Sequence, residues 1–479
     1  MQPSGFKQIN NGIQRFLIEK LPQVTSYLGK PVVVLTYPLV LTEPKARFLA
    51  GFSDQPRLSI RSLFSLREQW QIRRSAKAAE DLAQQLEACG RPLTIEEKMR
   101  LGCAHRDVAD ATLIKLSNRA MIAHIIPGIN KDEKLQKKID RVNGRLYGMV
   151  DRQRALACLA ILYPTIDSLR PEVAARYARR YPFINESCNR PLPYLRPAES
   201  AHYRHLLSEY FGSMLEAAFV GETIDTFDPA VDIPRVVRKA LVHLKARGWT
   251  ATYNGKRRAM AVSSRTKRVE SGKRVYKPSR VELEALLLHE VGVHALRSIN
   301  GSRLHSHLLA FGLPHFLDAE EGLGLLFEQI WLGKAEPTKL TKEYVRYLAI
   351  AYAEGVLDNS GQVKSFKQTF QFVRDILSID HSEDGQVNYA SQTASEAYDY
   401  TSRLYRGMPT GRIIRKDMAY LNGSVKLIDY FKDALLDSST DFIDRLVQGK
   451  YDPTNADHVA YLEEVLAKRK QRQKEKLPA

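Results

Sequence analysis

The sequence has few cysteines, no long apolar run and a deficit of acidic residues. No two of its four cysteines form a CxxC pair, and all lie far apart: Cys89, Cys103, Cys158 and Cys188. This spacing argues against a disulfide framework and against a zinc site built from thiolates. We therefore expect a cytoplasmic protein in which histidines and carboxylates bind any transition metal.

No stretch of the sequence has the length and apolar character of a membrane span. The N-terminus lacks the basic and then apolar pattern of a signal peptide. The longest apolar run, from Val32 to Leu41, is interrupted by Thr36 and Pro38, so it predicts a buried strand. We expect no membrane partner. The 479 residues, 44% of them hydrophobic, are enough for a large core.

Positive charge is abundant and unevenly placed. The formal net charge is +18, and the block from Arg235 to Arg280 contains fifteen basic residues and one acidic residue, Glu270. A second basic run, residues 468–476, ends the chain. We expect the basic block 235–280 to bind an acidic partner, because it directly precedes the candidate catalytic segment described below.

The secondary-structure signals predict an α+β protein that is predominantly helical. A capping box at Thr94-x-x-Glu97 and a helical pattern from Arg152 to Leu162 indicate helices in the first part of the chain. Farther on, Trp249–Tyr253 and Ala259–Ser263 alternate around Asn254-Gly255, which predicts a small β-hairpin. We divide the chain into an N-terminal helical region, a catalytic domain and a basic C-terminal tail, at 1–125, 126–450 and 451–479.

The strongest chemical signal is the segment His289-Glu290-Val291-Gly292-Val293-His294. A capping box at Ser279-x-x-Glu282 begins the apolar helix that carries it. The histidines are five residues apart, which separates them by about 140° on an ideal α-helix. Both rings reach one ion only if the helix widens or unwinds between them. Gly292 would accept such a distorted backbone at low steric cost.

The other roles in a catalytic zinc site are assigned to nearby carboxylates. Glu290 is placed to act as the general base that takes a proton from water and returns it to the leaving amine. Glu321 is the best candidate for the third ligand, and Glu320 is the neighbouring alternative. Asp318-x-x-Glu321 also has the pattern of a capping box. Three histidines in a loop region are rival ligands: His305, His307 and His315.

The region from Leu287 to Arg297, with Asn300 and the segment Glu320–Leu323 after it, resembles a known family. This family is the microtubule-associated tyrosine carboxypeptidases with their bacterial relatives, which share the five-residue histidine spacing. Two later segments, 403–407 and 416–423, resemble it as well. The similarity covers roughly residues 180 to 430. The sequence departs from the family at Gly324, where the family's motif usually has alanine.

The resemblance implies a zincin-like region in which His289, His294 and Glu321 bind one zinc ion per chain and Glu290 is catalytic. It also implies a carboxypeptidase that removes a C-terminal residue from a protein or peptide. Such an enzyme must bind a terminal carboxylate, and the forked donors of arginine suit that task. The candidates are Arg297, Arg403 and Arg406.

Two other classes of protein are alternatives to the metallopeptidase. A nucleic-acid-binding protein would use the basic block 235–280 to contact phosphates, but this leaves the His289–His294 segment unexplained. A scaffold with structural zinc would not need a base, so Glu290 counts against it. We favour a zinc metallopeptidase that acts on a protein or peptide with an acidic tail.

Overall fold

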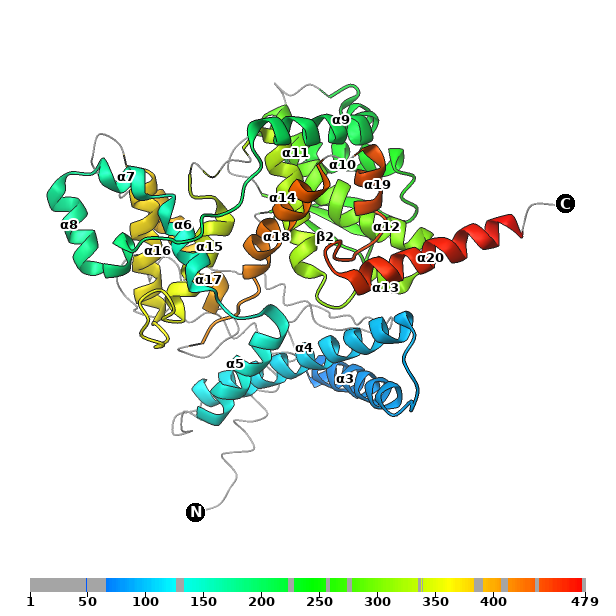
Figure 1. The fold of residues 1–479 in the computed structure, drawn as a ribbon, viewed down its shortest axis with the longest axis horizontal. Helices are drawn as coiled ribbons and strands as arrows, with labels where there is room; N and C mark the ends of the chain where they lie inside the picture. The colour runs from blue at the N-terminus through cyan, green and yellow to red at the C-terminus, as the bar shows by residue number, and fades with distance from the viewer. Residues whose placement is uncertain are drawn as a thin grey trace, which may run out of the picture. The chain divides into compact units, whose positions relative to one another are not determined.

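The computed structural model describes residues 49, 66–125, 133–222, 228–255, 259–273, 278–334, 337, 339–382, 391–405, 412–435 and 439–475. Their regular elements are mostly helices, with one small sheet, which confirms the prediction of a predominantly helical α+β protein (Figure 1). No helix in these ranges has the length and apolar character needed to cross a membrane. The strand predicted at Val32–Leu41 lies outside the described residues.

Two compact units make up the chain, and each is assembled from separate stretches of sequence. Their limits are Met1–Asp81, His105–Leu192 and Pro337–Met418 for the first, and Leu82–Ala104, Pro193–Glu336 and Ala419–Ala479 for the second. Two long helices contribute residues to both units: α3 (Leu66–Glu87) and α4 (Ile95–Ile125). The predicted capping box begins α4, since the Glu97 amide donates to Thr94 Oγ1 at 3.2 Å.

All regular elements among the described residues of the first unit are helices. Asp151 accepts hydrogen bonds from the next turn and caps α6, which confirms the helix predicted from Arg152. The elements of this unit are α5 (Glu133–Tyr147), α6 (Arg152–Ala160), α7 (Tyr163–Asp167), α8 (Pro171–Arg180), the 3-10 helix η2 (Pro182–Asn185), α15 (Lys342–Ala353), α16 (Phe366–Asp380) and α17 (Ser391–Tyr405).

The second unit contains the sheet and the His289–His294 segment. Its elements are α9 (Pro197–Phe219), α10 (Asp232–His243), β1 (Thr250–Asn254), β2 (Ala261–Ser263), β3 (Arg268–Gly272), α11 (Arg280–Leu287), the π-helix η4 (Leu288–Ala295), α12 (Leu296–Arg303), α13 (His307–Phe311), α14 (Leu317–Leu332), α18 (Met418–Ala434), α19 (Thr440–Leu446) and α20 (Ala456–Lys474). One apolar core joins η4 to α9, α10, α14 and α18, through residues such as Val291, Phe211, Val237, Phe327 and Phe431.

The predicted hairpin between Trp249–Tyr253 and Ala259–Ser263 is wrong. The strand order is β1-β3-β2, with β3 parallel to β1 and antiparallel to β2. The hairpin is instead formed by β2 and β3, which are joined by the turn at residues 264–267, where Lys267 has a φ of 48°. Val269 in β3 is almost fully buried against the core, and the most buried strand takes the central place. A turn signal in the local sequence contains no information about which strand packs against the core.

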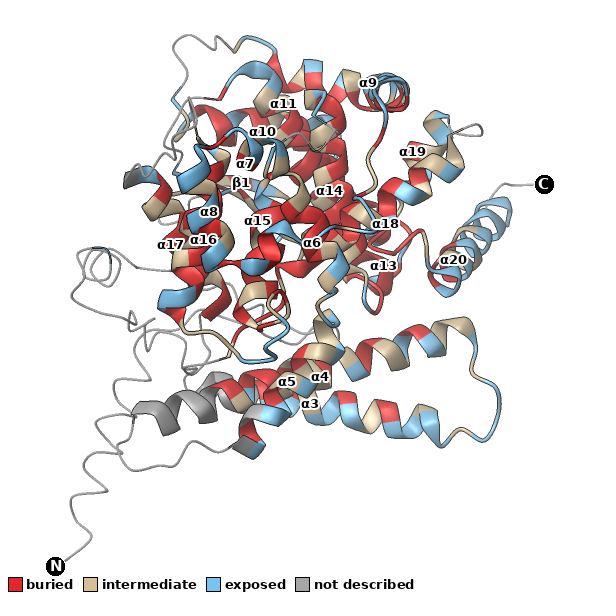
Figure 2. Ribbon diagram, turned by 60° about the vertical axis from the view of Figure 1, so that its left-hand side comes forward, coloured by how far each residue is buried: buried red, intermediate tan, exposed pale blue. Residues whose placement is uncertain are grey.

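The C-terminal segment 451–479 contains a long helix with two different halves. Asn455 caps α20 by accepting from two backbone amides. The first half is anchored, because His458, Tyr461 and Leu462 are buried. Residues 467–475 are exposed throughout, as the end of α20 in Figure 2 shows. The basic run predicted as a tail therefore includes a solvated helical arm.

Two glycines let α14 and α18 touch through their backbones. A Cβ on Gly322 would lie 2.2 Å from the carbonyl carbon of Gly423. A Cβ on Gly423 would lie 1.7 Å from the carbonyl oxygen of Asp318. Neither position has room for a side chain, so these glycines hold the first turns of α14 against α18. Because Glu321 precedes Gly322, this contact also fixes the backbone of a candidate ligand.

Replacing Gly423 with alanine is expected to lower the free energy of unfolding by about 1–3 kcal/mol, because the new methyl group forces two backbones apart. Urea unfolding followed by circular dichroism measures this change. Gly212→Ala is the control: it lies in α9, and a Cβ added there would have no neighbour within 4 Å, so helix propensity favours alanine. An unchanged unfolding midpoint for Gly423→Ala would contradict the proposed contact.

Candidate metal centre

The two histidines lie in a π-helical segment. The capping box predicted at Ser279 begins α11, with the Glu282 amide donating to Ser279 Oγ at 3.3 Å. The helix then continues into η4, where the Leu296 amide donates to the carbonyl oxygen of Val291, five residues earlier. Hydrogen bonds of this type place residues five apart on adjacent turns. The prediction that the helix widens between the histidines is confirmed.

Gly292 has a different role from the predicted one. It is not among the residues with positive φ, so η4 widens without a backbone conformation that needs glycine. A Cβ on Gly292 would instead lie 3.2 Å from a ring carbon of Phe211. The missing side chain therefore allows α9 to pack closely against the π-helix at the point between the two histidines.

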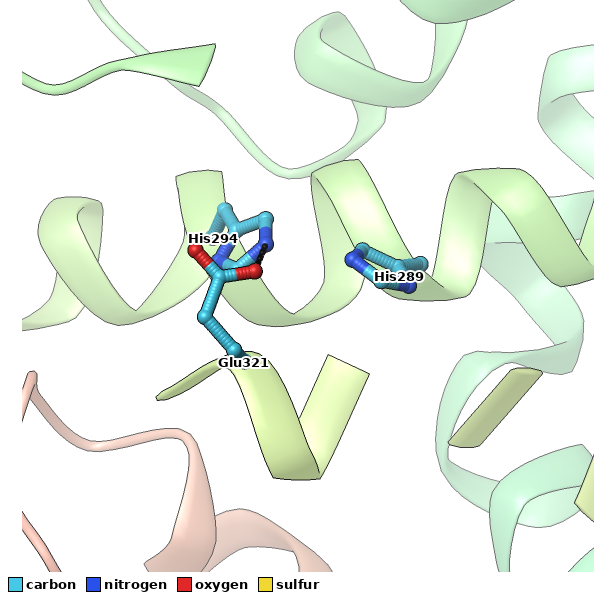
Figure 3. A group of neighbouring side chains, drawn as sticks. All are labelled: His289, His294 and Glu321. Atoms are coloured by element: carbon cyan, nitrogen blue, oxygen red, sulfur yellow. Dashed lines mark ion pairs between the residues drawn. The ribbon is translucent and has the colours of Figure 1, made fainter. Parts of the chain in front are cut away.

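His289, His294 and Glu321 form a group with the geometry of a metal site. One ligand atom from each lies within 4.8 Å of the others. The ring centroids of the histidines are 5.0 Å apart, and His294 Nε2 lies 3.8 Å from Glu321 Oε2. Figure 3 shows Glu321 reaching from α14 toward the helix that carries both rings. Among the described residues, this group includes neither Glu320 nor the rival histidines, which are His305, His307 and His315.

Each imidazole has a carboxylate on its Nδ1 atom. His289 Nδ1 lies 3.0 Å from Glu328 Oε2, and His294 Nδ1 lies 3.0 Å from Glu320 Oε1. These contacts leave the two Nε2 atoms for a metal, which is the usual outer arrangement around ligating histidines. Burial lowers the pKa of His289, but the hydrogen bond to Glu328 and the nearby carboxylate charges raise it overall, to about 9.

Glu320 is held in place by a buried cluster of charges. Arg297 Nη1 donates to Glu320 Oε2 at 2.6 Å, and Lys450 Nζ donates to Glu320 Oε1. Burial raises the pKa of Glu320, but these cations and His294 lower it more, so the carboxyl is charged. Arg297 is fully buried and also donates to the carbonyl oxygen of Tyr451. This geometry assigns Arg297 to holding Glu320 and not to binding a substrate carboxylate.

The Glu290 carboxylate is available for chemistry. It is 9% exposed and directly follows His289 in η4. Within the described part of the chain, it forms no hydrogen bond or ion pair, although its charge acts on His289. A carboxylate that is neither bridged nor capped can accept a proton.

The other two candidate arginines belong to a different part of the chain. Arg403, in the first unit, forms a bidentate ion pair with Asp417, at 2.6 Å from Nε to Oδ2 and 2.9 Å from Nη2 to Oδ1. Arg406 lies outside the described residues. A substrate-binding role for these two residues stays a prediction.

The alternative interpretation of Glu321 as a capping residue is wrong. α14 begins at Leu317, and its N-cap, Phe316, forms no side-chain cap. Asp318 therefore lies inside the first turn and cannot form a capping box with Glu321. This leaves the Glu321 carboxylate with His294 as its only ion-pair partner in the described ranges.

Sequence reasoning missed two residues that position the histidines, Glu328 and Lys450. Glu328 follows Glu321 by seven residues, or about two helical turns, so both carboxylates lie near one face of α14. That spacing was a usable signal. Lys450 has none, because it lies 130 residues after Glu320 in the chain.

The structure gives a physical reason for glycine at position 324, where the family's motif usually has alanine. A Cβ at this position would lie 2.9 Å from both Nε2 and Cδ2 of His289. The imidazole therefore lies directly over Gly324, and an alanine would force the ring or α14 to shift. The substitution that looks small in the sequence sets how closely α14 approaches the first histidine.

The fold and these side chains define a candidate metal centre built from two histidines of a π-helix and a glutamate of the next long helix. Residues 258–470 match the family model described as microtubule-associated tyrosine carboxypeptidase. The resemblance inferred from the sequence is thereby confirmed over this region, which begins and ends later than the span of roughly 180 to 430. The matched residues include every member of the centre. A search of curated proteins finds no match.

Proposed function

We propose that this protein is a zinc-dependent carboxypeptidase with a zincin-like catalytic region. The observation that carries the proposal is the group of His289, His294 and Glu321, in which both imidazoles have a carboxylate on Nδ1. The activity in the name of the matched family supports removal of a C-terminal residue from a protein or peptide. The free Glu290 carboxylate supports an enzyme over a structural zinc scaffold.

Zinc fits the donor set of the centre. Two imidazole nitrogens and one carboxylate are a common ligand set of catalytic zinc, which keeps a further position open. Glu328 and Glu320 would orient the rings of His289 and His294 toward the metal. Zinc, when bound, would act as a Lewis acid that lowers the pKa of water and polarises the scissile carbonyl group.

The chemistry assigned to the protein itself is proton transfer by Glu290. Its carboxylate would take a proton from the water whose oxygen adds to the carbonyl carbon of the last peptide bond. When the carbon–nitrogen bond breaks, the same group would give this proton to the leaving amine. The products are a shortened chain with a new carboxylate and a free amino acid.

An acidic peptide is the substrate class that the positive charges favour. Ion pairs within the protein neutralise some of the basic residues in the block 235–280. Lys239 and Arg235 both pair with Glu222, and Arg280 pairs with Glu284. By contrast, Arg265 and Lys267 in the β2–β3 turn have no carboxylate partner among the described residues. We propose that this turn attracts acidic residues upstream of the C-terminus.

A library of peptides with acidic or neutral C-terminal regions tests this function. Purified wild-type protein, Glu290→Gln and chelator-treated protein are incubated with it, and products are identified by mass spectrometry. We expect single C-terminal residues to be lost with the wild type alone, fastest from acidic peptides. Cleavage within peptides would reject the carboxypeptidase. No cleavage of these peptides or of whole acidic proteins, at one zinc per chain, would reject the proposed activity.

The carboxylates behind the histidines should set the affinity for zinc. Glu320→Gln and Glu328→Gln are each expected to weaken zinc binding by about 10- to 100-fold, because each removes the charged partner of an imidazole. Competition with a fluorescent chelator measures this affinity. Glu284→Gln is the control, since Glu284 pairs with Arg280 and Trp331 instead of a histidine. If all three variants bound zinc as tightly as the wild type, the carboxylates of Glu320 and Glu328 would not contribute to zinc affinity.

A further inference from the structure

A separate pocket lies in the second unit, where α9, α10, α12, α19 and α20 meet. Its volume is about 320 Å³, at the small end of the range of about 300–1,000 Å³ for ligand sites. Phe211, Met214 and Leu296 line its apolar side, and none of the candidate metal ligands contributes to it. A ligand in this pocket would be small and distinct from the substrate of the metal centre.

The charges around the pocket are unbalanced in favour of cations. Arg303 donates to Asn300 Oδ1 at 3.0 Å and to backbone carbonyl oxygens, but it has no carboxylate partner within the described part of the chain. Arg469 of α20 forms no hydrogen bond or ion pair with the described residues. Two guanidinium groups therefore border the pocket without an ion-pair partner among the described residues.

Among the described residues, one acidic side chain lines the pocket, Asp444, and both of its oxygens already accept hydrogen bonds from neutral donors. Asp444 Oδ1 accepts a hydrogen bond from the Tyr210 hydroxyl at 2.7 Å, and Asp444 Oδ2 accepts one from Gln448 Nε2 at 2.7 Å. Asp444 forms no ion pair with either arginine, so their guanidinium groups can bind an anion that enters the pocket. A guanidinium group binds phosphate oxygens through a planar fork of donors, and it does so best when no carboxylate competes.

We propose that this pocket binds a small phosphate monoester. Arg303 and Arg469 would hold the phosphate group, and the apolar side formed by Met214 and Leu296 would contact the organic part. Ser213 Oγ and His243 Nε2 lie 3.2 Å apart at the same pocket and offer further donors to the anion. The proposal goes beyond the carboxypeptidase activity and does not depend on it.

The pocket shares side chains with the packing around the π-helix η4. Phe211 lines it and also lies against Gly292, between the two histidines. Leu296 lines it as well, and η4 ends immediately before Leu296. An occupant would therefore press on side chains that hold η4, and we expect binding to raise the unfolding temperature of the protein.

Calorimetric titration of the zinc-loaded, full-length protein tests the proposal, with inorganic phosphate and phenyl phosphate as probes. We expect phenyl phosphate to bind more tightly, and Arg469→Gln to weaken it by about 10-fold or more, because a charged hydrogen bond is lost. Arg472→Gln is the matched control, an exposed arginine of the same helix that does not line the pocket. It should bind as the wild type does.

Each other outcome has a defined meaning. Equal affinity of the two probes, with the loss in Arg469→Gln retained, would support free phosphate as the ligand of the same site. Unchanged affinity in Arg469→Gln would overturn the proposal, since the anion would then bind elsewhere, such as at the metal centre. An equal loss in Arg472→Gln would reveal general attraction to the basic arm, and no binding at millimolar concentrations would also overturn the proposal.

Discussion

The Glu290→Gln variant is expected to retain one zinc ion per chain and to lose about 100- to 10,000-fold in kcat, the range for removal of a general acid–base group. The carboxylate is nearly buried beside His289 and has no hydrogen-bond partner in the described ranges, so its loss removes a function and not a structural contact. Glutamine preserves the shape but cannot accept the proton from water. Peptide turnover and zinc content, measured on the same preparation, separate these effects.

The Glu284→Gln variant provides a matched control for this experiment. Glu284 lies in α11, the helix that continues into η4, and pairs with Arg280 away from the histidines. Its turnover should equal that of the wild type. If Glu290→Gln retained full activity, another group would have to transfer the proton and the mechanism proposed here would be wrong.

Replacing His289 with alanine is expected to reduce bound zinc far below one ion per chain. The substitution removes one of the two proposed imidazole ligands, together with its contact to Glu328. Loss of a protein ligand opens the donor set to water, which is a weaker ligand for zinc than imidazole. Elemental analysis after dialysis gives the zinc content, and circular dichroism checks that the helices remain.

His305→Ala distinguishes this centre from the rival assignment of the third ligand. His305 lies outside the group formed by His289, His294 and Glu321, so this variant should retain its zinc. Equal zinc in His289→Ala and the wild type would place the metal elsewhere. Loss of zinc in His305→Ala would show that this loop contributes a ligand.

Local hydrogen bonding explains which elements were predictable. The capping boxes at Thr94 and Ser279 depend on contacts three residues apart, so the sequence alone indicated where α4 and α11 begin. The strand pairing could not be predicted from local contacts. Asn254-Gly255 is typical of a turn, but a turn does not determine which strand is central in the sheet. Burial of Val269 in the core decided that β3 lies between β1 and β2.

The sequence by itself determined that the helix must widen or unwind if both histidines are to reach one ion, because residues five apart lie about 140° from each other on an ideal α-helix. The structure shows that it widens into a π-helix. Only the tertiary structure decided which glutamate faces the free His294 nitrogen. Glu320 and Glu321 are adjacent and chemically identical, but Arg297 and the distant Lys450 hold Glu320 on Nδ1. Glu321 is thereby left near Nε2 of His294. The two glutamates differ only in which charged side chains folding brings next to them, and the local sequence does not contain that information.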